Sequence, residues 1–318
     1  MTEVEALLQP AAVDVTPSAA AKGRNFLREL AHSGTGLAGA LFLLIVVLCA
    51  IFAGLIAPHD PNSQDLANRL ARPVFFGGHW NHPLGTDQLG RDLFSRMLFG
   101  ARVTMIVACS VVALAGSLGV FMGLISGYFG GWADRIIMRF ADTQLAFPGL
   151  LLALIILYTI GPSVKLLVIV LAINGWLVYA RIVRGLVLGV KSSEYIEAAE
   201  ISGVKSFRIM IRHIIPNIAS PVLTLLVLEF ARIILAEASL SFLGYGVQPP
   251  ESSWGLIIGQ GQDYLTTDGW LVAIPGITIC LTVLSANLLA SWLRIYADPK
   301  QRERRFGKQL DELAKVAG

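Results

Sequence analysis

The sequence predicts an all-α integral membrane protein with about six transmembrane helices. Hydrophobic residues make up 55% of the chain and charged residues only 15%, a balance that is too apolar for a soluble protein of this length. The apolar residues are gathered in long runs that contain few charges, and polar segments separate these runs. Clusters of basic residues flank several of the runs, as is usual in proteins that cross a bilayer more than once.

The first run, residues 35–57, contains no charged residue. About 22 residues of α-helix extend about 33 Å, which is enough for a hydrocarbon core of about 30 Å. Five further spans are expected at about residues 103–126, 142–160, 166–190, 218–243 and 270–293. The chain is therefore expected to consist of a tail (1–34), a transmembrane domain (35–299) and a second tail (300–318).

The positive-inside rule predicts the orientation of the spans. Basic residues stand before the first run, at the end of the fourth and after the sixth, namely Lys22, Arg24, Arg28, Arg181, Arg184, Lys191, Arg294 and the run 300–305. Both termini and the loop 191–217 are therefore expected in the cytoplasm. The segment of about 58–102 and the loop of about 244–268 are expected outside, and this loop contains acidic residues but no lysine or arginine.

The second and third spans carry irregular features. Gly119, Gly123 and Gly127 recur at every fourth residue, so one face of the second span is expected to let another helix approach closely. Residues 127–140 are expected to form a short cytoplasmic turn. Phe147-Pro148-Gly149 interrupts the third span, where the proline either kinks the helix or marks its first turn.

The loop 191–217 is expected to fold as two short helices joined by a turn. Residues 193–201 form the first helix, and Gly203 supplies a turn position where a side chain would be costly. Ser206 is expected to cap the second helix, and Pro216 is expected to close it because proline cannot continue a helix. A polar loop held between two membrane spans is expected to be presented to a partner.

Several motifs resemble those of the permease subunits of ABC importers. The loop residues similar to the EAA loop of that family are Glu197, Ala198, Ala199, Gly203, Ile215 and Pro216. His213 departs from the pattern, in which a branched apolar residue is usual, but His-x-x-Pro-Asn is similar to the dipeptide and oligopeptide branch. Further stretches similar to that branch, and to its C-type permease, are residues 82–96, 237–244, 246–250 and 253–255. The alternative for the loop is an ordinary amphipathic cytoplasmic hairpin.

The resemblance implies a type I ABC importer permease in the plasma (inner) membrane of a bacterium or archaeon. The EAA loop would form coupling helices that dock on a separate ATPase. The implied partners are a homologous second permease in a heterodimer, two ABC ATPase subunits, an extracytoplasmic substrate-binding protein, the lipid bilayer and a peptide substrate, with no nucleic acid. The chain would bind no cofactor, since ATP and Mg would be used by the partner ATPase. Gln248, Pro249 and Trp254 would be candidate contacts of the binding protein, although Trp254 could equally anchor the chain at the membrane interface.

Charged residues inside the fifth span are candidates for the translocation path. Glu229, Arg232 and Glu237 lie among leucines and isoleucines, and a charge at the middle of a bilayer costs roughly 2.5 to 3.5 kcal/mol. These side chains should therefore face protein or a water-filled path. Glu229 and Arg232 are three residues apart and could pair on one helix face, so the alternative is a buried structural ion pair. Asn174, near the middle of the fourth span, is a further path candidate.

The sequence lacks the motifs of the common hydrolases. The only Gly-Lys pair, Gly307-Lys308, has Arg302 where the first glycine of an ATP-binding loop should be. The five histidines are dispersed, so a metal site would need the fold to bring them together. We therefore expect no catalytic residue and no metal site, and the energy for transport must come from a partner.

Three alternative functions are compatible with the sequence. The chain could be a permease of the same family for nickel or another small solute. It could be a self-sufficient secondary transporter that uses Glu229, Arg232 and Glu237 as an ion relay. It could also be a membrane scaffold whose loop recruits a soluble protein.

Overall fold

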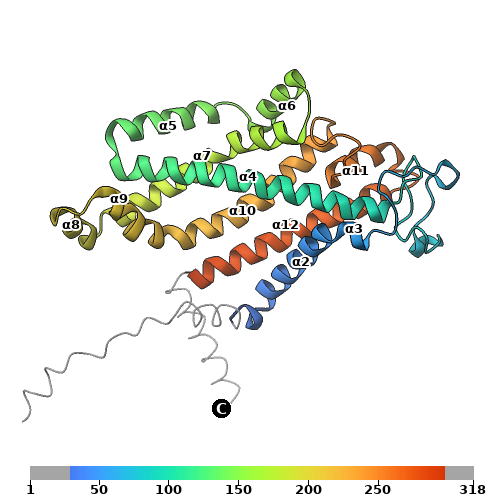
Figure 1. Ribbon diagram of the computed structural model, residues 1–318, viewed down its shortest axis with the longest axis horizontal. Coiled ribbons are helices and arrows are strands. Elements are labelled where there is room, and N and C mark those ends of the chain that lie inside the picture. Colours follow the sequence, from blue (N-terminus) through green and yellow to red (C-terminus); the bar gives the residue numbers. More distant parts are fainter. Residues whose placement is uncertain (1–28, 298–318) are drawn as a thin grey trace, which may run out of the picture.

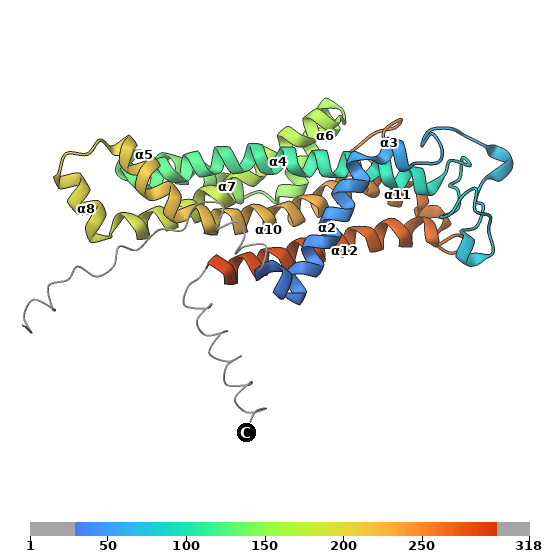
Figure 2. The same ribbon diagram turned by 60° about the horizontal axis from the view of Figure 1, so that its bottom comes forward.

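The described chain is an elongated bundle of helices in a computed structural model (Figure 1). The structure describes residues 29–297, so most of the first expected tail and all of the second lie outside the described residues. Figures 1 and 2 both show α8 (Glu194–Ile201) at one end of the bundle, and α3 (Ala53–Ile56) and α11 (Trp254–Gly261) at the other. The bundle thus holds the 191–217 loop far from the 58–102 segment.

Long apolar helices confirm the expected fold class. They are α2 (Gly34–Ile51), α4 (Leu93–Phe129), α7 (Val164–Lys191), α10 (Ile215–Phe242) and α12 (Trp270–Ala297). Within the described residues, 5 helices are long and apolar enough to cross a membrane, or up to 6 when a bent pair counts as one span. Short elements connect them, namely η2 (Leu66–Asn68), η3 (Val74–Phe76), α9 (Ser206–Ile209), η4 (Met210–Ile214) and η5 (Gln262–Tyr264).

The bent pair differs from the expected third span. The turn expected over 127–140 is wrong, because α4 continues to Phe129 and α5 (Gly131–Leu145) begins directly after Gly130. The helix then breaks, and α6 (Gly149–Ile160) starts at an angle of 79° to α5. Pro148 lies immediately before α6, where its missing N–H costs no helical hydrogen bond. The bend is therefore a break between two helices and not a kink within one.

Ion pairs explain why the charged residues 131–145 remain helical beside α7. Arg184 donates to both carboxylate oxygens of Asp134, at 2.5 and 2.7 Å. Arg181 donates through Nη2 to a single carboxylate oxygen of Asp142. From the sequence, the charged residues suggest an exposed turn. Their ion-pair partners lie about 40 to 50 residues later in the chain, so the sequence alone does not reveal them.

The glycine stripe of α4 packs against α7, as its spacing predicts. A Cβ atom added at Gly123 would lie 2.7 Å from both the carbonyl oxygen of Ala180 and Cβ of Val183. A Cβ atom at Gly127 would lie 2.8 Å from Cβ of Val187. The backbones of the two helices are therefore too close for any larger residue in the stripe.

Candidate functional site

The 191–217 loop is packed firmly onto the bundle. Ile196, Ile209 and Ile214 are fully buried, and they form one apolar cluster with residues of α4 and α7 that include Leu124 and Val183. The helix, turn and helix predicted from the sequence are present as α8, a bend at Gly203 with φ of +75°, and α9. The loop is therefore a defined protrusion of the bundle.

Polar contacts also hold the inner side of the loop. The hydroxyl of Tyr128 donates to a carboxylate oxygen of Glu200 over 3.0 Å, and the ammonium group of Lys191 donates to the carbonyl oxygen of Tyr128 over 2.8 Å. On the exposed side of the loop, the amide of Asn217 donates to the hydroxyl of Tyr195 over 3.2 Å. Of the glutamates in α8, Glu200 thus serves the contact with α4.

The outer side of the loop exposes large apolar side chains. Ile201 is 88% exposed and Phe207 is 70% exposed, and the other exposed residues of the loop include Tyr195, Glu197, Ala198, Gly203, Ile211, Ile215 and Pro216. Ala199 is half-buried. The side chain of Glu197 makes no hydrogen bond or ion pair among the described residues. An apolar surface of this kind usually marks an interaction site, and we call these residues the loop patch.

Two sequence predictions about the second helix of the loop are wrong. Ser206 is its first residue and not its cap, because Lys205 occupies the capping position without a side-chain bond. Pro216 does not close the helix. A π-helical turn, Met210–Ile214, leads directly into α10, and Pro216 lies in the first turn of α10. The wider turn accommodates the proline, which can neither donate a hydrogen bond nor fit a regular helix interior.

The expected pair in the fifth span is present. Nε of Arg232 donates to Oε2 of Glu229 over 2.7 Å, and the terminal Nη2 lies 2.6 Å from the same oxygen. The Glu229 side chain is 9% exposed, but that of Arg232 is 51% exposed. The pair is therefore neither fully buried nor fully exposed, and it presents its cationic side away from the core.

The other path candidates lie at two different places. Arg232 is close to α7, since a Cβ atom at Gly175 would lie 3.8 Å from Nη2 of Arg232. Asn174, the neighbour of Gly175, is half-buried and receives a 3.4 Å hydrogen bond from the amide of Gln144. Glu237 is fully buried, two helical turns beyond Glu229.

Glu237 connects α10 to α4 and does not extend the charged pair. Its carboxylate accepts hydrogen bonds from the hydroxyls of Thr104, at 3.1 Å, and Ser241, at 2.7 Å. Eight residues of helix separate it from Glu229 by about 12 Å along the axis. The three charges therefore do not form a continuous relay.

The 58–102 segment is locked to α11 by buried charges. The carboxylate of Asp87 accepts from Nε of Arg91 over 2.7 Å and also pairs with Arg96. Both arginines donate to the side-chain oxygen of Gln260, at 3.1 and 2.7 Å. Asp92 caps α4 by accepting from the backbone N–H of Ser95 over 2.8 Å. Residues 82–96 thus form a turn that is locked by Asp/Arg hydrogen bonds and leads into α4.

The 244–268 loop places its candidate contacts differently. Pro249 is exposed, and Gln248 is half-buried and donates to the carbonyl oxygen of Gly244 over 2.9 Å. Trp254 is only 1% exposed, and its indole N–H donates to the carbonyl oxygen of Met97 over 3.1 Å. Trp254 is therefore a packing residue between α11 and α4, and its side chain is not available as a surface contact or as a membrane anchor.

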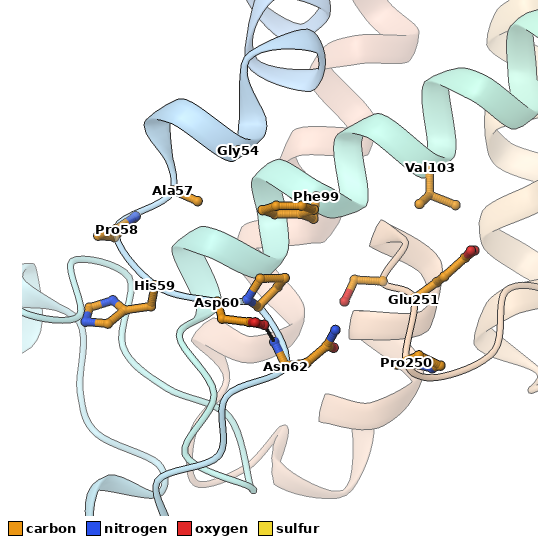
Figure 3. Close-up of a pocket in the computed structure, with 12 residues that line it drawn as sticks. Gly54, Ala57, Pro58, His59, Asp60, Asn62, Phe99, Val103, Pro250 and Glu251 are labelled. Carbon is orange, nitrogen blue, oxygen red and sulfur yellow. Dashed lines mark hydrogen bonds between the residues drawn. The ribbon is translucent and has the colours of Figure 1, made fainter.

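A cavity lies beside this loop. Its volume is about 630 Å³, and Asp60, Asn62, Pro250, Glu251 and Phe99 are among the residues that line it. Figure 3 shows Pro250 and Glu251 across the cavity from Asp60 and Asn62, which come from the chain after α3. The cavity thus joins the two segments that were expected on the same side of the membrane.

Comparison with known proteins decides the family. Residues 119–303 match the family described as "Binding-protein-dependent transport system inner membrane component". Residues 23–73 match the "N-terminal TM domain of oligopeptide transport permease C". The chain belongs to the family of binding-protein-dependent transport inner membrane components. Within this family it is a permease of the oligopeptide and dipeptide C type, a subunit of a peptide ABC transporter.

Curated relatives span nearly the whole permease. The "Di/tripeptide transport system permease protein DppC" of Pseudomonas aeruginosa (strain UCBPP-PA14) is 38% identical over 278 residues, which cover 87% of this chain and 92% of the relative. The "Dipeptide transport system permease protein DppC" of Alkalihalophilus pseudofirmus is 36% identical, with 88% and 90% covered. The "Glutathione transport system permease protein GsiD" of Pectobacterium atrosepticum is 36% identical, with 87% and 91% covered.

Membership of the family establishes the role of this chain in its transporter. It is a multi-pass inner membrane protein and the membrane subunit of its transporter, and it is not itself catalytic. The family binds no cofactor, and ATP is used by the ATPase partner.

Some residues of the site could not be found by sequence reasoning. Ile201 and Gln260 belong to none of the motifs. Ile201 does give one signal, because a large apolar residue in a polar loop often marks a contact surface. Gln260 gives no such signal, because its role depends on arginines more than 160 residues earlier in the chain.

Proposed function

We propose that the permease forms half of the translocation path for di- or oligopeptides, beside a homologous second permease, and couples to a separate ATPase through the 191–217 loop. One observation carries the proposal. The loop is anchored on its inner side by buried isoleucines and exposes the loop patch on its outer side. A surface that is apolar, held from beneath by packed side chains and exposed among residues 29–297 is suited to docking on another subunit.

The loop can pass motion to the path because it is continuous with a long helix. Residues 206–242 form one helix of 37 residues, which corresponds to about 55 Å. The helix begins beside Gly203 and carries Glu229 and Arg232 farther along. Displacement of the loop by ATP-driven closure of two ATPases would therefore rock the bundle between inward-open and outward-open states.

The proposed orientation follows the positive-inside rule. The 191–217 loop and both termini face the cytoplasm, and the 244–268 loop faces an extracytoplasmic substrate-binding protein. Gln248 and Pro249 are the contacts we propose for that protein, while Trp254 packs α11 of the same loop onto α4. The domain limits proposed are 1–34, 35–299 and 300–318.

The proposed path is lined by Asn174, Glu229 and Arg232. The pair offers the half-exposed guanidinium of Arg232 to the carboxylate of a peptide, while Glu229 balances its charge from the buried side. The names of the relatives, which specify di/tripeptides, dipeptides and glutathione, support a short peptide as the substrate. Glu237 is a structural contact and not part of the lining.

A substitution that strains the backbone at Gly203 tests whether the 191–217 loop docks on the ATPase. Gly203 has φ of +75° with open space around it, so Gly203→Val distorts the turn without a clash. We expect loss of peptide uptake and of peptide-stimulated ATPase activity, with unchanged amounts of the chain in the membrane. Glu197→Lys, which reverses the charge of the loop patch, should have the same effect.

Gly161→Val is the matched control. Gly161 also has a positive φ, of +104°, and open space, but lies in the turn between α6 and α7. Its variant should retain uptake. Uptake by Gly203→Val equal to that of this control would refute the docking role, and ion-driven uptake by the chain alone in liposomes would support a secondary transporter instead.

A further inference from the structure

The fold brings two dispersed histidines together beside Asp92. The imidazole Nδ1 of His82 lies 3.0 Å from Oδ1 of Asp92, and Nδ1 of His59 lies 4.0 Å from Oδ2 of the same carboxylate. The two rings are 4.8 Å apart between centroids and inclined by 32°. One potential ligand atom from each residue lies within 4.8 Å of the others. The fold thus supplies for this pair the proximity that the dispersed histidines of the sequence would need for a metal site.

The ligand positions are built into the backbone. Asp92 is the cap of α4, and its Oδ2 is oriented by the backbone N–H of Ser95. The hydroxyl of Ser95 in turn accepts from the backbone N–H of His59 over 3.2 Å. His82 opens a turn that closes on Gly85, and the neighbouring Thr86 pairs with Asp92 in a β-bridge. Secondary contacts of this kind orient ligands around metal ions in proteins.

The His59 ring is the observation that points to a ligand. It faces the carboxylate of Asp92 at 4.0 Å, which is too long for a hydrogen bond. The side chain is 41% exposed, so it is free to move closer. Figure 3 shows the ring directed away from the cavity that its backbone helps to line.

We propose that His59, His82 and Asp92 bind a divalent transition-metal ion such as Zn²⁺. Two imidazoles and a carboxylate suit Zn²⁺, Co²⁺ and Ni²⁺ better than Mg²⁺ or Ca²⁺, which prefer shells of oxygen ligands. Ligands at about 2.1 Å in a tetrahedral site are about 3.4 Å apart. The 3.0 Å contact of His82 is near this separation, and His59, which lies 4.0 Å from Asp92 with all ligand atoms within 4.8 Å of one another, would move closer on binding. Water would complete the coordination shell.

The ion would tie the end of α3 to the start of α4. It would hold the wall of the 630 Å³ cavity that runs through His59 and Asp60, at the end of the bundle opposite α8. The site is thus a clamp on the segment between the first two spans. It does not depend on the proposed function, because it needs neither the loop patch nor the ATPase.

Zinc binding to the purified full-length chain tests the proposal. The chain is prepared with a tag that contains no histidine and titrated with Zn²⁺ by calorimetry, and bound metal is counted by mass spectrometry. We expect one Zn²⁺ per chain. His59→Ala should weaken binding at least about tenfold, since loss of even a second-shell partner costs about 10- to 100-fold. The His59 side chain makes no hydrogen bond among the described residues, so this variant should keep its fold.

His79→Ala is the control, because His79 is an exposed histidine of the same segment but outside the cluster. It should bind as the wild type does. Zn²⁺ should also raise the unfolding temperature of the wild type and of His79→Ala but not of His59→Ala. Absence of binding by the wild type, equal affinities of wild type and His59→Ala, or equal weakening by His79→Ala would each overturn the site.

Discussion

At the scale of single residues, the pair Glu229 and Arg232 illustrates how the permease carries charge inside an apolar helix. The carboxylate is buried and the guanidinium is half exposed, so each charge is compensated while one remains accessible. Such a pair costs less than an isolated charge in the membrane. It can therefore be retained for a role in transport.

Replacing both Glu229 and Arg232 by neutral residues distinguishes a structural role of the pair from a role in transport. Arg232→Gln leaves the Glu229 charge buried without its partner, so a lower unfolding temperature is expected. Glu229→Gln together with Arg232→Gln removes both charges and should restore the unfolding temperature. If the pair lines the path, peptide uptake stays low in the double variant, as measured in proteoliposomes with both permeases and the ATPases. Full uptake by a stable double variant would show that the pair is only structural.

Sequence reasoning succeeds at this scale where partners are close in the chain. The spacing of Glu229 and Arg232 predicts their contact, and the glycine spacing of α4 predicts a packing face. It fails where partners are remote. His59 and His82 meet only because the α3 end folds back onto α4, and Trp254 is buried by a contact with Met97 that lies 157 residues away in sequence.

At the scale of elements, the permease depends on the close approach of α4 and α7. These helices connect the 191–217 loop to the middle of the bundle, and their contact contains glycines with no room for a side chain. The helix breaks are less predictable than this contact. Pro148 lies at the break between α5 and α6. Pro216 instead follows a π-helical turn and lies in the first turn of α10, so the helix continues through it. The two prolines therefore have different effects on the helices around them.

The glycine contact is tested by a pair of alanine variants. Gly123→Ala should lower the free energy of unfolding by about 1 to 3 kcal/mol, because the added methyl group forces the helices apart. Gly185→Ala, at an α7 glycine with open space around it, should be neutral or stabilising by up to about 1 kcal/mol. Thermal unfolding in detergent compares them. Equal stability of the two variants would refute the tight contact.

At the scale of the whole molecule, the two regions for which we propose functions lie at opposite ends of a continuous helical bundle. The loop patch lies at one end. At the other end lie the ion pairs of Asp87 with Arg91 and Arg96, the cavity, and the cluster of His59, His82 and Asp92. Apolar periodicity and basic flanks predict the helices between them. The surface of the loop patch is not predictable in the same way, because Phe207 and Ile214 share one apolar spacing, yet Phe207 is 70% exposed and Ile214 is fully buried.

The central claim is that the loop patch docks on an ATPase, and its most direct test is co-purification. Ile201→Glu places a charge at the centre of the patch, whereas Leu66→Glu places one on a side chain that is also exposed, 65%, at the opposite end of the bundle. Each variant is purified from its own membranes, and the associated ATPase is quantified against the second permease. We expect Ile201→Glu to lose the ATPase but keep the second permease, and Leu66→Glu to keep both. Full recovery of the ATPase with Ile201→Glu would contradict the claim.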